Sequence, residues 1–502
     1  MLKGGVMNER TIGGWQEAMG RGEITAVGLV EYYLERIDQI DRNGPTLNSV
    51  LELNPQAEEI AAALDEEREK MGPRGPLHGL PLMLKGNIDT ADRMTTTAGS
   101  LALKGHIAVQ DAFLVQRLRE AGAVILGKTN LSEWANFRST HSSSGWSSQG
   151  GQTRNPYALD RNPCGSSSGS GVAVAADLCV AAVGTETDGS IICPAHNNGI
   201  VGLKPTVGLV SRSGIIPISH SQDTAGPMAR TVADTAVVLE AMTGVDPRDE
   251  ATLAGSEYGT RFLELDVEGL RGARIGVARN LCDADPHTNA VLEESLRAMR
   301  DLGAVVIDDA NIKTDGLWKE AELEVCYYEF KAGLNAYLGQ LEPEARVHSL
   351  ADVIAFNKAN QEVMMPYFKQ EHFLAAQEKG PLTDESYQKA LAECRRLTRE
   401  EGINAALFRH NLDALVTLSG EVAWLIDWVK GDRCVGGSWS PAAVAGYPSI
   451  SVPAGYVFGL PVNISFIAGA WQERKLIGLA YAFEQATQLR RSPRFLQTVE
   501  FN

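Results

Sequence analysis

Residues 164–194 read CGSSSGSGVAVAADLCVAAVGTETDGSIICP, and this stretch decides the fold. It belongs to a Ser/Gly-rich region, 139–171, whose composition alone is typical of a flexible linker. Apolar segments of small residues follow that region directly, at 172–176 and 180–183. They predict a buried helix and then a buried strand that pack closely together. We therefore interpret the Ser/Gly region as part of the folded core.

The segments on both sides of this stretch alternate between strand and helix patterns. Apolar runs that predict strands lie at 82–84, 123–126, 275–277, 305–307, 415–418, 450–452 and 464–467, and helical spacing at 111–120, 291–299 and from Lys475 onward. This alternation predicts an α/β layer structure. We expect one large α/β/α domain over residues 1–502, with a central mixed, mostly parallel twisted sheet covered by helices.

Two other regions have helical patterns. Residues 1–70 are predicted to be helical, with Thr25 as the cap of one helix and Asn54-Pro55 at the start of another. Residues 317–410 are more charged and mostly helical, which predicts a helical cover over the α/β core. No internal repeat and no clean linker divides the chain.

The composition excludes several classes of function. With 46 Lys and Arg against 63 Asp and Glu, the formal net charge is −17, so nucleic acids and anionic membranes are not expected partners. No apolar run is long enough to span a membrane, and the first 20 residues lack the apolar core of a secretory signal, so we expect a cytoplasmic location. The seven cysteines contain no CxxC pair, which predicts mostly buried free thiols rather than a disulfide framework or a zinc site.

One motif suggests a nucleotide-binding protein. Residues 122–129, GAVILGKT, fit the phosphate-loop pattern GxxxxGK[ST], with Lys128 as the phosphate ligand. A phosphate cradle needs an open loop after a strand, whereas residues 123–126 have the character of a strand themselves. A buried strand is the favoured interpretation, and nucleotide binding through Lys128 stays as an alternative from another functional class.

A second motif suggests an α/β-hydrolase. Gly165-Ser-Ser167-Ser-Gly169 fits the nucleophile-elbow pattern GxSxG. That fold needs a strand directly before the first glycine, but residues 159–164 contain a proline and make a poor strand. None of the later histidines has a context typical of a catalytic triad, so this interpretation is disfavoured.

A third pattern uses more of the chain. Lys85 ends an apolar strand, Ser166 lies in the Gly/Ser loop, and Ser190 lies in the stretch GTETDGSIICP, residues 184–194. Together with HGLPLMLKGNID around Lys85, GKTNLSEWANF at 127–137, SQDTAGPMARTVAD at 221–234 and the AGYPSISVPAGY and GLPVNISF segments near the end, this order of motifs resembles the amidase signature family. The signature core would cover about residues 75–250.

The sequence departs from the common family pattern in four places. Cys164 and Asp188 stand where glycine is usual, Ile192 replaces an arginine, and Gly86 replaces an aspartate after the lysine. The first three departures are similar to the bacterial peptide amidases. The fourth leaves open how Lys85 is positioned.

The resemblance implies a serine amidase with a Ser-Ser-Lys relay and no metal or organic cofactor. Ser190 would be the nucleophile, Ser166 the proton relay after a cis Gly165–Ser166 peptide bond, and Lys85 the base. A free lysine has a pKa of about 10.4, so about one amine in 2,500 is neutral at pH 7, and Lys85 must be buried to act as a base.

Substrate recognition follows from the same resemblance. The backbone N–H groups of Thr187, Asp188 and Gly189 would form an oxyanion hole, and Asn136 would contact the substrate. Hydrolysis of the C-terminal carboxamide of peptides to the free acid and ammonia is the expected activity, in a monomer or homodimer. An amidase for other small or aryl amides, an amide-hydrolysing component of an amidotransferase complex, and a catalytically silent member of the family stay as alternatives.

Overall fold

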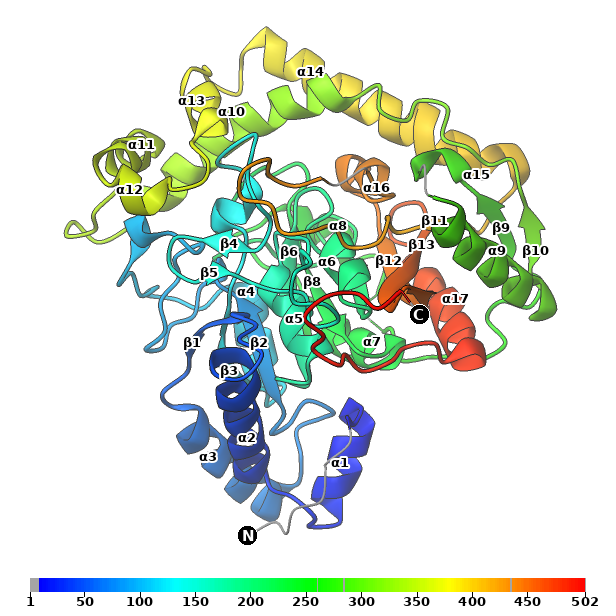
Figure 1. Cartoon of the computed structure of the whole chain (residues 1–502), viewed down its shortest axis with the longest axis horizontal. Helices are drawn as coiled ribbons and strands as arrows, with labels where there is room; N and C mark the ends of the chain where they lie inside the picture. The colour runs from blue at the N-terminus through cyan, green and yellow to red at the C-terminus, as the bar shows by residue number, and fades with distance from the viewer. Residues whose placement is uncertain (1–8, 260, 283–284, 434–435, 502) are drawn as a thin grey trace.

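One mixed β-sheet forms the centre of the molecule (Figure 1). The computed structural model describes residues 9–259, 261–282, 285–433 and 436–501. Within these residues eleven strands join one sheet in the order β1-β3-β2-β6-β8-β7-β12-β13-β11-β9-β10, and β4 pairs with β5 outside it. The strands are β1 Val50–Leu53, β2 Pro81–Lys85, β3 Val124–Thr129, β4 Trp146–Ser147, β5 Gly151–Gln152, β6 Ala181–Glu186, β7 Val201–Lys204, β8 Thr224–Ala229, β9 Arg274–Val277, β10 Val305–Ile307, β11 Ala414–Leu418, β12 Ser449–Val457 and β13 Leu460–Ile467.

The α/β class and the mixed sheet are confirmed, but the expectation of a mostly parallel sheet is wrong. Six of the ten neighbouring pairs in the described sheet are antiparallel. Only β2 with β3 and β6, and β9 with β10 and β11, run parallel. A short connection explains one antiparallel pair: β12 and β13 are separated by Phe458-Gly459, both at positive φ, and a two-residue turn joins only antiparallel strands.

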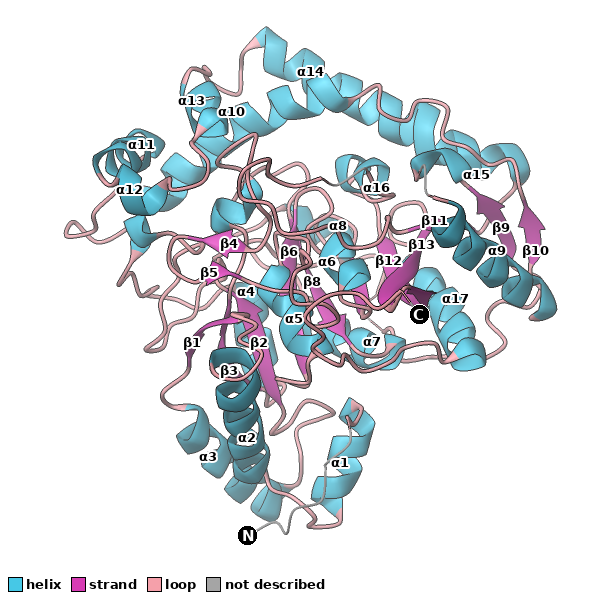
Figure 2. Cartoon of the chain, in the orientation of Figure 1, coloured by secondary structure: helices cyan, strands magenta, loops and turns pink. Residues whose placement is uncertain are grey.

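Helices surround the sheet (Figure 2). They are α1 Ile12–Gly20, α2 Ala26–Arg36, α3 Ala57–Met71, α4 Phe113–Glu120, α5 Ser168–Ala175, α6 Ile192–Asn197, α7 Val232–Met242, α8 Ala251–Gly255, α9 Pro286–Asp301, α10 Lys319–Leu338, α11 Leu350–Ala359, α12 Gln361–Met364, α13 Glu371–Gln377, α14 Glu385–Arg395, α15 Asn404–His410, α16 Ser440–Ala445 and α17 Glu473–Thr487. Helices α10 to α15 form the predicted helical segment, and Figure 1 shows them as an arch along one side of the molecule.

The sequence patterns located most of these elements correctly. Thr25 caps α2 by accepting a hydrogen bond from the Gly28 N–H, and Asn54 accepts one from Gln56 just before α3. The buried helix and strand after the Ser/Gly loop are α5 and β6. One correction concerns residues 1–70, which also contain β1 at the edge of the sheet. All described strands between residues 50 and 467, β4 and β5 apart, join the one sheet. The single domain over residues 1–502 stays a prediction.

The phosphate-loop alternative is wrong. Residues 124–129 are strand β3, every residue of which is buried. The amine of Lys128 donates to the carbonyl of Ile88 at 2.5 Å and to the hydroxyl of Thr96 at 3.2 Å. A lysine held inside the protein by these groups cannot bind a phosphate, because a phosphate cradle requires an open loop with free N–H groups.

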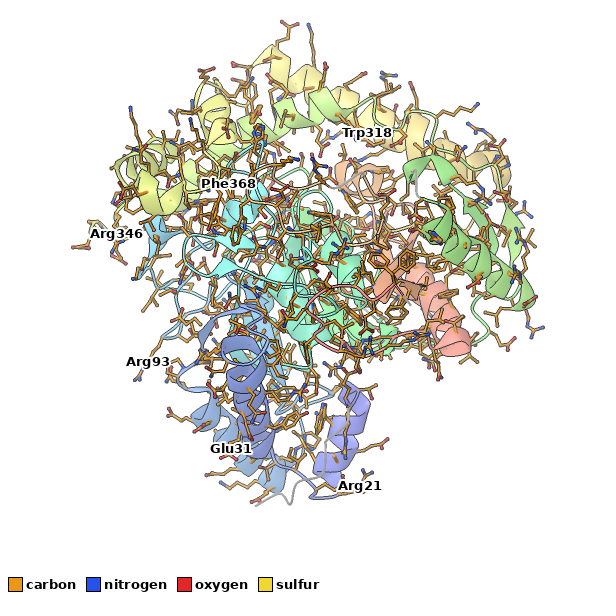
Figure 3. The ribbon with its side chains drawn as sticks, viewed as in Figure 1. Arg21, Glu31, Arg93, Trp318, Arg346 and Phe368 are labelled. Atoms are coloured by element: carbon orange, nitrogen blue, oxygen red, sulfur yellow. A yellow bond between two sulfur atoms is a disulfide. The ribbon has the colours of Figure 1, made fainter. Side chains whose placement is uncertain are left out.

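Arg138 joins the helical arch to the core. Its guanidinium lies 2.6 Å from the carboxylate of Glu133, donates to the carbonyl of Met364 at the end of α12, and stacks 4.4 Å over the ring of Phe368. Both charged side chains are almost completely buried. Figure 3 labels Phe368 and Trp318, two buried residues from the segment that contains the arch.

We expect Arg138→Ala to destabilise the protein by about 3–5 kcal/mol, because it leaves the Glu133 carboxylate buried without its cation. Chemical denaturation with urea measures the change. Arg93→Ala, at an exposed arginine, is the control and should change stability by less than about 0.5 kcal/mol. An equal effect of the two substitutions would contradict this role of Arg138.

Candidate active site

Lys85 ends the buried strand β2, and its side chain is fully buried. Its Nζ lies 2.7 Å from the hydroxyl of Ser166, and it is also within hydrogen-bond distance of the Thr185 hydroxyl, at 2.8 Å, and the Thr185 carbonyl, at 3.1 Å. A side chain at position 86 would approach Leu51, Thr129 and Leu131 within 3.0–3.2 Å, so glycine suits this packed site. Thr185 and Ser166, rather than residue 86, position the amine.

Burial lowers the pKa of Lys85 to about 7, although the carboxyl groups of Glu186 and Asp223 act in the opposite direction. About half of the amines are therefore neutral at pH 7. A neutral amine has a free lone pair and can accept the hydroxyl proton of Ser166 across the same 2.7 Å contact.

Ser166 lies in a tightly packed loop directly before α5. The peptide bond between Gly165 and Ser166 is cis, as the family resemblance implied. The Ser166 carbonyl accepts the N–H of Ser132 at 3.1 Å, and a Cβ at Gly165 would lie 2.2 Å from the hydroxyl of Ser132. Only glycine fits at position 165, and the loop fixes the Ser166 hydroxyl beside Lys85.

Ser190 lies in the turn between β6 and α6 and is 8% exposed. Its carbonyl accepts the N–H of Ser167 at 3.2 Å, so the turn and the Gly/Ser loop are in direct main-chain contact. The structure thus brings Lys85 and Ser166 together and places the Ser190 main chain against the residue that follows Ser166.

The turn at residues 187–190 is held from several sides. Gly189 adopts a φ of +78°, which favours glycine, and the indole of Trp439 packs so closely that a Cβ at Gly189 would lie 2.6 Å from it. The Thr187 hydroxyl donates to Asp223 at 2.5 Å, and Gln222 donates to the Thr187 carbonyl at 3.2 Å. This packing fixes the direction of the backbone N–H groups in the turn.

Two carboxyl groups beside the turn have raised pKa values. Burial raises the pKa of Glu186, while Lys204 and the N–H groups of Ile191, Ile192 and Gly189 lower it. Burial also raises the pKa of Asp188 well above its usual range, and the nearby Glu322 from α10 raises it further. The Gly189 N–H therefore faces the Glu186 carboxyl group. To stabilise an oxyanion, as the sequence predicts, this N–H would have to turn toward the substrate.

Asn136 lies in a tight turn, 133–136, and its Oδ1 is buried with no hydrogen-bond partner among the described residues. Such an oxygen is available to a substrate N–H. The preceding residue, Ala135, lines a cavity of about 220 Å³ together with Thr185, Thr187, Ile216 and Ile218. The cavity therefore extends from Ala135, next to Asn136, to Thr185, which contacts Lys85, and to Thr187 in the turn 187–190.

The two tryptophans of this region, Trp134 and Trp146, pack in the interior. Trp134 makes an edge contact with Phe373 from α13, with ring centres 5.9 Å apart, and Trp146 packs on Phe368 at 5.1 Å. Both are almost fully buried.

The nucleophile-elbow interpretation is wrong. No strand of the described sheet precedes Gly165 directly. The Ser167 hydroxyl is completely buried and is occupied by the main chain of Thr185, donating to its carbonyl at 3.0 Å and accepting its N–H at 3.2 Å. Ser167 thus holds the loop to the end of β6.

The cysteine prediction needs a correction. Three described cysteines, Cys179, Cys326 and Cys394, are buried and form no disulfide, as expected, but Cys164 and Cys193 form a disulfide. In the sequence, one cysteine precedes the first serine motif and the other follows the second, but this spacing did not predict that they bond. Thr185 lies in the same motif as Ser190, so the motif contained this site residue. Trp439 lies 249 positions after Ser190, and no sequence pattern linked it to the site.

The sequence and the fold of this chain are similar to those of known proteins. A family model described as Amidase matches residues 28–477. A protein named "Probable amidase" from Arabidopsis thaliana is 42% identical, covering 98% of this chain and 92% of its own. The solved native peptide amidase of Stenotrophomonas maltophilia is 51% identical with a TM-score of 0.92, covering 97% of this chain and 99% of that one. The crystal structure of an amidase family protein from Bacillus anthracis is 38% identical with a TM-score of 0.88, over 97% and 92% of the two chains.

The chain belongs to the amidase family. It has the fold of the amidase signature enzymes and is an amide hydrolase that acts on carbon–nitrogen bonds.

We expect the kcat/KM for amide hydrolysis to rise about tenfold per pH unit below pH 6, about fivefold between pH 6 and pH 7, and to level off above about pH 8. The physical reason is that the fraction of neutral Lys85, with a pKa of about 7, falls from one half at pH 7 to about one tenth at pH 6. Initial rates between pH 5 and 9 measure the profile, and circular dichroism at each pH checks that the enzyme stays folded. A flat profile over this range would contradict Lys85 as the base.

Proposed function

We propose that this enzyme hydrolyses the C-terminal carboxamide of peptides to the free acid and ammonia through an acyl-enzyme on Ser190. The observation that carries the proposal is the buried Lys85 amine, with a pKa of about 7, at 2.7 Å from the Ser166 hydroxyl. The overall similarity to a peptide amidase over 97% of the chain supports the peptide substrate.

The proposed reaction uses one proton path in both directions. Neutral Lys85 takes the proton of Ser166, which takes the proton of Ser190, and the Ser190 oxygen attacks the carboxamide carbon. The same path returns the proton to the leaving nitrogen, the C–N bond breaks, and ammonia departs. Water then attacks the acyl-enzyme, giving its proton to the relay, and the free acid and the Ser190 hydroxyl are restored.

The proposed oxyanion hole is the turn 187–190. Backbone N–H groups of Thr187, Asp188 and Gly189 would stabilise the negative oxygen of the tetrahedral intermediate. The close packing of Trp439 on Gly189 and the hydrogen bonds of Thr187 hold this turn in place. The Gly189 N–H, which faces the Glu186 carboxyl group, would have to turn toward the substrate to take part. No cofactor takes part in the proposed steps.

Other properties follow as proposals. We expect peptide amides or other amides as the bound partners, no nucleic acid or membrane, a cytoplasmic location, and a monomer or homodimer. Among the described helices, none has both the length and the apolar character that a membrane crossing requires.

Ammonia release from an amidated dipeptide, compared with its free-acid form, tests the function directly. We expect ammonia only from the amide and no cleavage of the internal peptide bond. An aryl amide and free glutamine in the same panel test the alternatives of a general amidase and of an amidotransferase component. Turnover of those compounds without turnover of peptide amides would contradict the peptide substrate, and no turnover of any amide would favour a catalytically silent family member.

Single substitutions test the roles of the three groups. Ser190→Ala, Ser166→Ala and Lys85→Met should each lower kcat by about 10³-fold or more, since residues of one relay act as a unit. Ser167→Ala is the matched control in the same loop and should keep kcat within about tenfold, because its hydroxyl makes hydrogen bonds to the Thr185 main chain and none to Lys85, Ser166 or the Ser190 side chain among the described residues. A fluorophosphonate should label Ser190 and leave Ser167 unlabelled. The reverse pattern would contradict the proposed nucleophile.

Asn136→Ala should weaken substrate recognition. The substitution removes the hydrogen bond that the unpartnered Oδ1 would accept from a substrate N–H, and we expect kcat/KM to fall by about tenfold. Steady-state kinetics on the amidated dipeptide measure the change, with Asn360→Ala, on an exposed helix end, as the control. An unchanged kcat/KM would show that Asn136 has no role in substrate binding.

A further inference from the structure

The Cys164–Cys193 disulfide joins the two loops that carry the proposed reacting serines. The Cα atoms are 5.9 Å apart, and the two residues are separated by 29 positions in the sequence. Cys164 lies two residues before Ser166, and Cys193 lies three residues after Ser190, in the first turn of α6. The covalent loop that the disulfide closes therefore contains both serines and the whole turn 187–190.

Hydrogen bonds are weaker contacts between the same two segments. Asn197 and Asn198 at the end of α6 donate side-chain hydrogen bonds to the carbonyls of Asn162 at 3.2 Å and Pro163 at 2.9 Å. A third contact is the Ser167 N–H to Ser190 carbonyl bond at 3.2 Å. The disulfide is the one covalent link between the two loops within the described residues.

The backbone at Cys164 gives an independent reason to assign a role to this pair. Cys164 has a φ of +58°, in the left-handed region that favours glycine over any residue with a Cβ. A cysteine at such a position is disfavoured by its own conformation. Its sulfur makes the bond to Cys193 and a long contact to the Gly165 carbonyl at 3.6 Å.

We propose that the Cys164–Cys193 disulfide is a redox-sensitive positioning element for the Ser166–Ser190 pair, so that reduction lowers the turnover of the enzyme. This inference rests on the proposed function. A dithiol supplies two electrons and two protons: its two S–H groups become its own disulfide, the bond between the two cysteines breaks, and each cysteine becomes a thiol.

The reason for the loss is geometric. A relay requires its hydroxyl groups at hydrogen-bond distance, and a displacement of about 1 Å lowers a rate by about 10²-fold. With the bridge open, only non-covalent packing and hydrogen bonds hold the loop of Ser166 against the turn of Ser190. We therefore expect kcat to fall by about tenfold or more, while KM, which depends on contacts outside the closed loop such as Asn136, changes by less than about threefold.

The two sulfur atoms are poorly accessible. Cys164 is 6% exposed and Cys193 is 2% exposed, so a dithiol will reduce the folded enzyme slowly. Disulfides persist in oxidising compartments and are rare in the reducing cytosol. In the reducing cytoplasm proposed for this enzyme the bridge would therefore open slowly, and the enzyme would lose activity there and regain it on oxidation.

The experiment compares the air-oxidised enzyme with the enzyme treated with dithiothreitol over several hours. A non-reducing peptide map first verifies the Cys164–Cys193 link and its loss. Two readouts are then taken from each sample: kcat and KM for an amidated dipeptide, and the rate of fluorophosphonate labelling at Ser190. Circular dichroism and a melting curve verify that the reduced enzyme is folded, and re-oxidation should restore the original kcat.

Variants make the test independent of access to the sulfur atoms. Cys164→Gly combined with Cys193→Ala removes the bridge and also relieves the positive φ at residue 164, so this variant is the one most able to fold. Cys394→Ala, at a buried free cysteine in α14, is the matched control and should keep both the kcat and the sensitivity to dithiothreitol.

The outcomes separate this inference from the proposed function. A fall of kcat and of the labelling rate in both the reduced enzyme and the double variant, with folding retained, supports the inference. An unchanged kcat and labelling rate in either the reduced enzyme or the double variant would overturn the inference. An air-oxidised enzyme whose peptide map lacks the Cys164–Cys193 link would also overturn it. If no peptide amide is hydrolysed but labelling of Ser190 still depends on the bridge, the proposed substrate fails and the positioning role stands. If Ser190 is labelled in neither state and no amide is hydrolysed, both fail.

Discussion

The burial of one amine is the constraint on which the candidate site depends. An ammonium inside an apolar sheet is unfavourable, and for Lys85 this cost brings the pKa down to about 7. The carboxyl groups of Glu186 and Asp223 reduce the shift but do not cancel it. Three oxygens, from Ser166 and twice from Thr185, give the amine hydrogen-bond partners within 3.1 Å. The same arrangement that makes the lysine a possible base at neutral pH also fixes the direction of its nitrogen.

The sheet explains why the parts of the site meet. Strands β2 and β6 are parallel neighbours, so Lys85 at the end of one lies beside Thr185 near the end of the other. The turn after β6 and the Gly/Ser loop before α5 then come together at the same edge. Glycines at 165 and 189 are required there because neighbouring side chains, Ser132 and Trp439, leave no space for a Cβ. Close packing, rather than a large number of polar contacts, fixes the two serine segments.

The C-terminal part of the chain and the helical arch complete this packing from the other side. Trp318, at the start of α10, donates to the hydroxyl of Ser440, next to Trp439, at 3.1 Å. Gln222 contacts both the Thr187 carbonyl and the Glu322 carboxyl of α10. The arch is thus connected to the turn through side chains of residues far apart in the sequence, which explains how a helical cover can influence a site built from the signature core.

The sequence by itself determined the α/β class, most helices and strands, and the order of the motifs around Lys85, Ser166 and Ser190. These features depend on local spacing and on residue types, which a single chain displays directly. The tertiary structure alone decided the strand directions, the edge strand β1, the Cys164–Cys193 bond, the contact of Thr185 with Lys85 and the packing of Trp439 on Gly189. Each of these is either a contact between residues distant along the chain or a strand direction that depends on the path of the connection between strands. Local spacing carries no information about either.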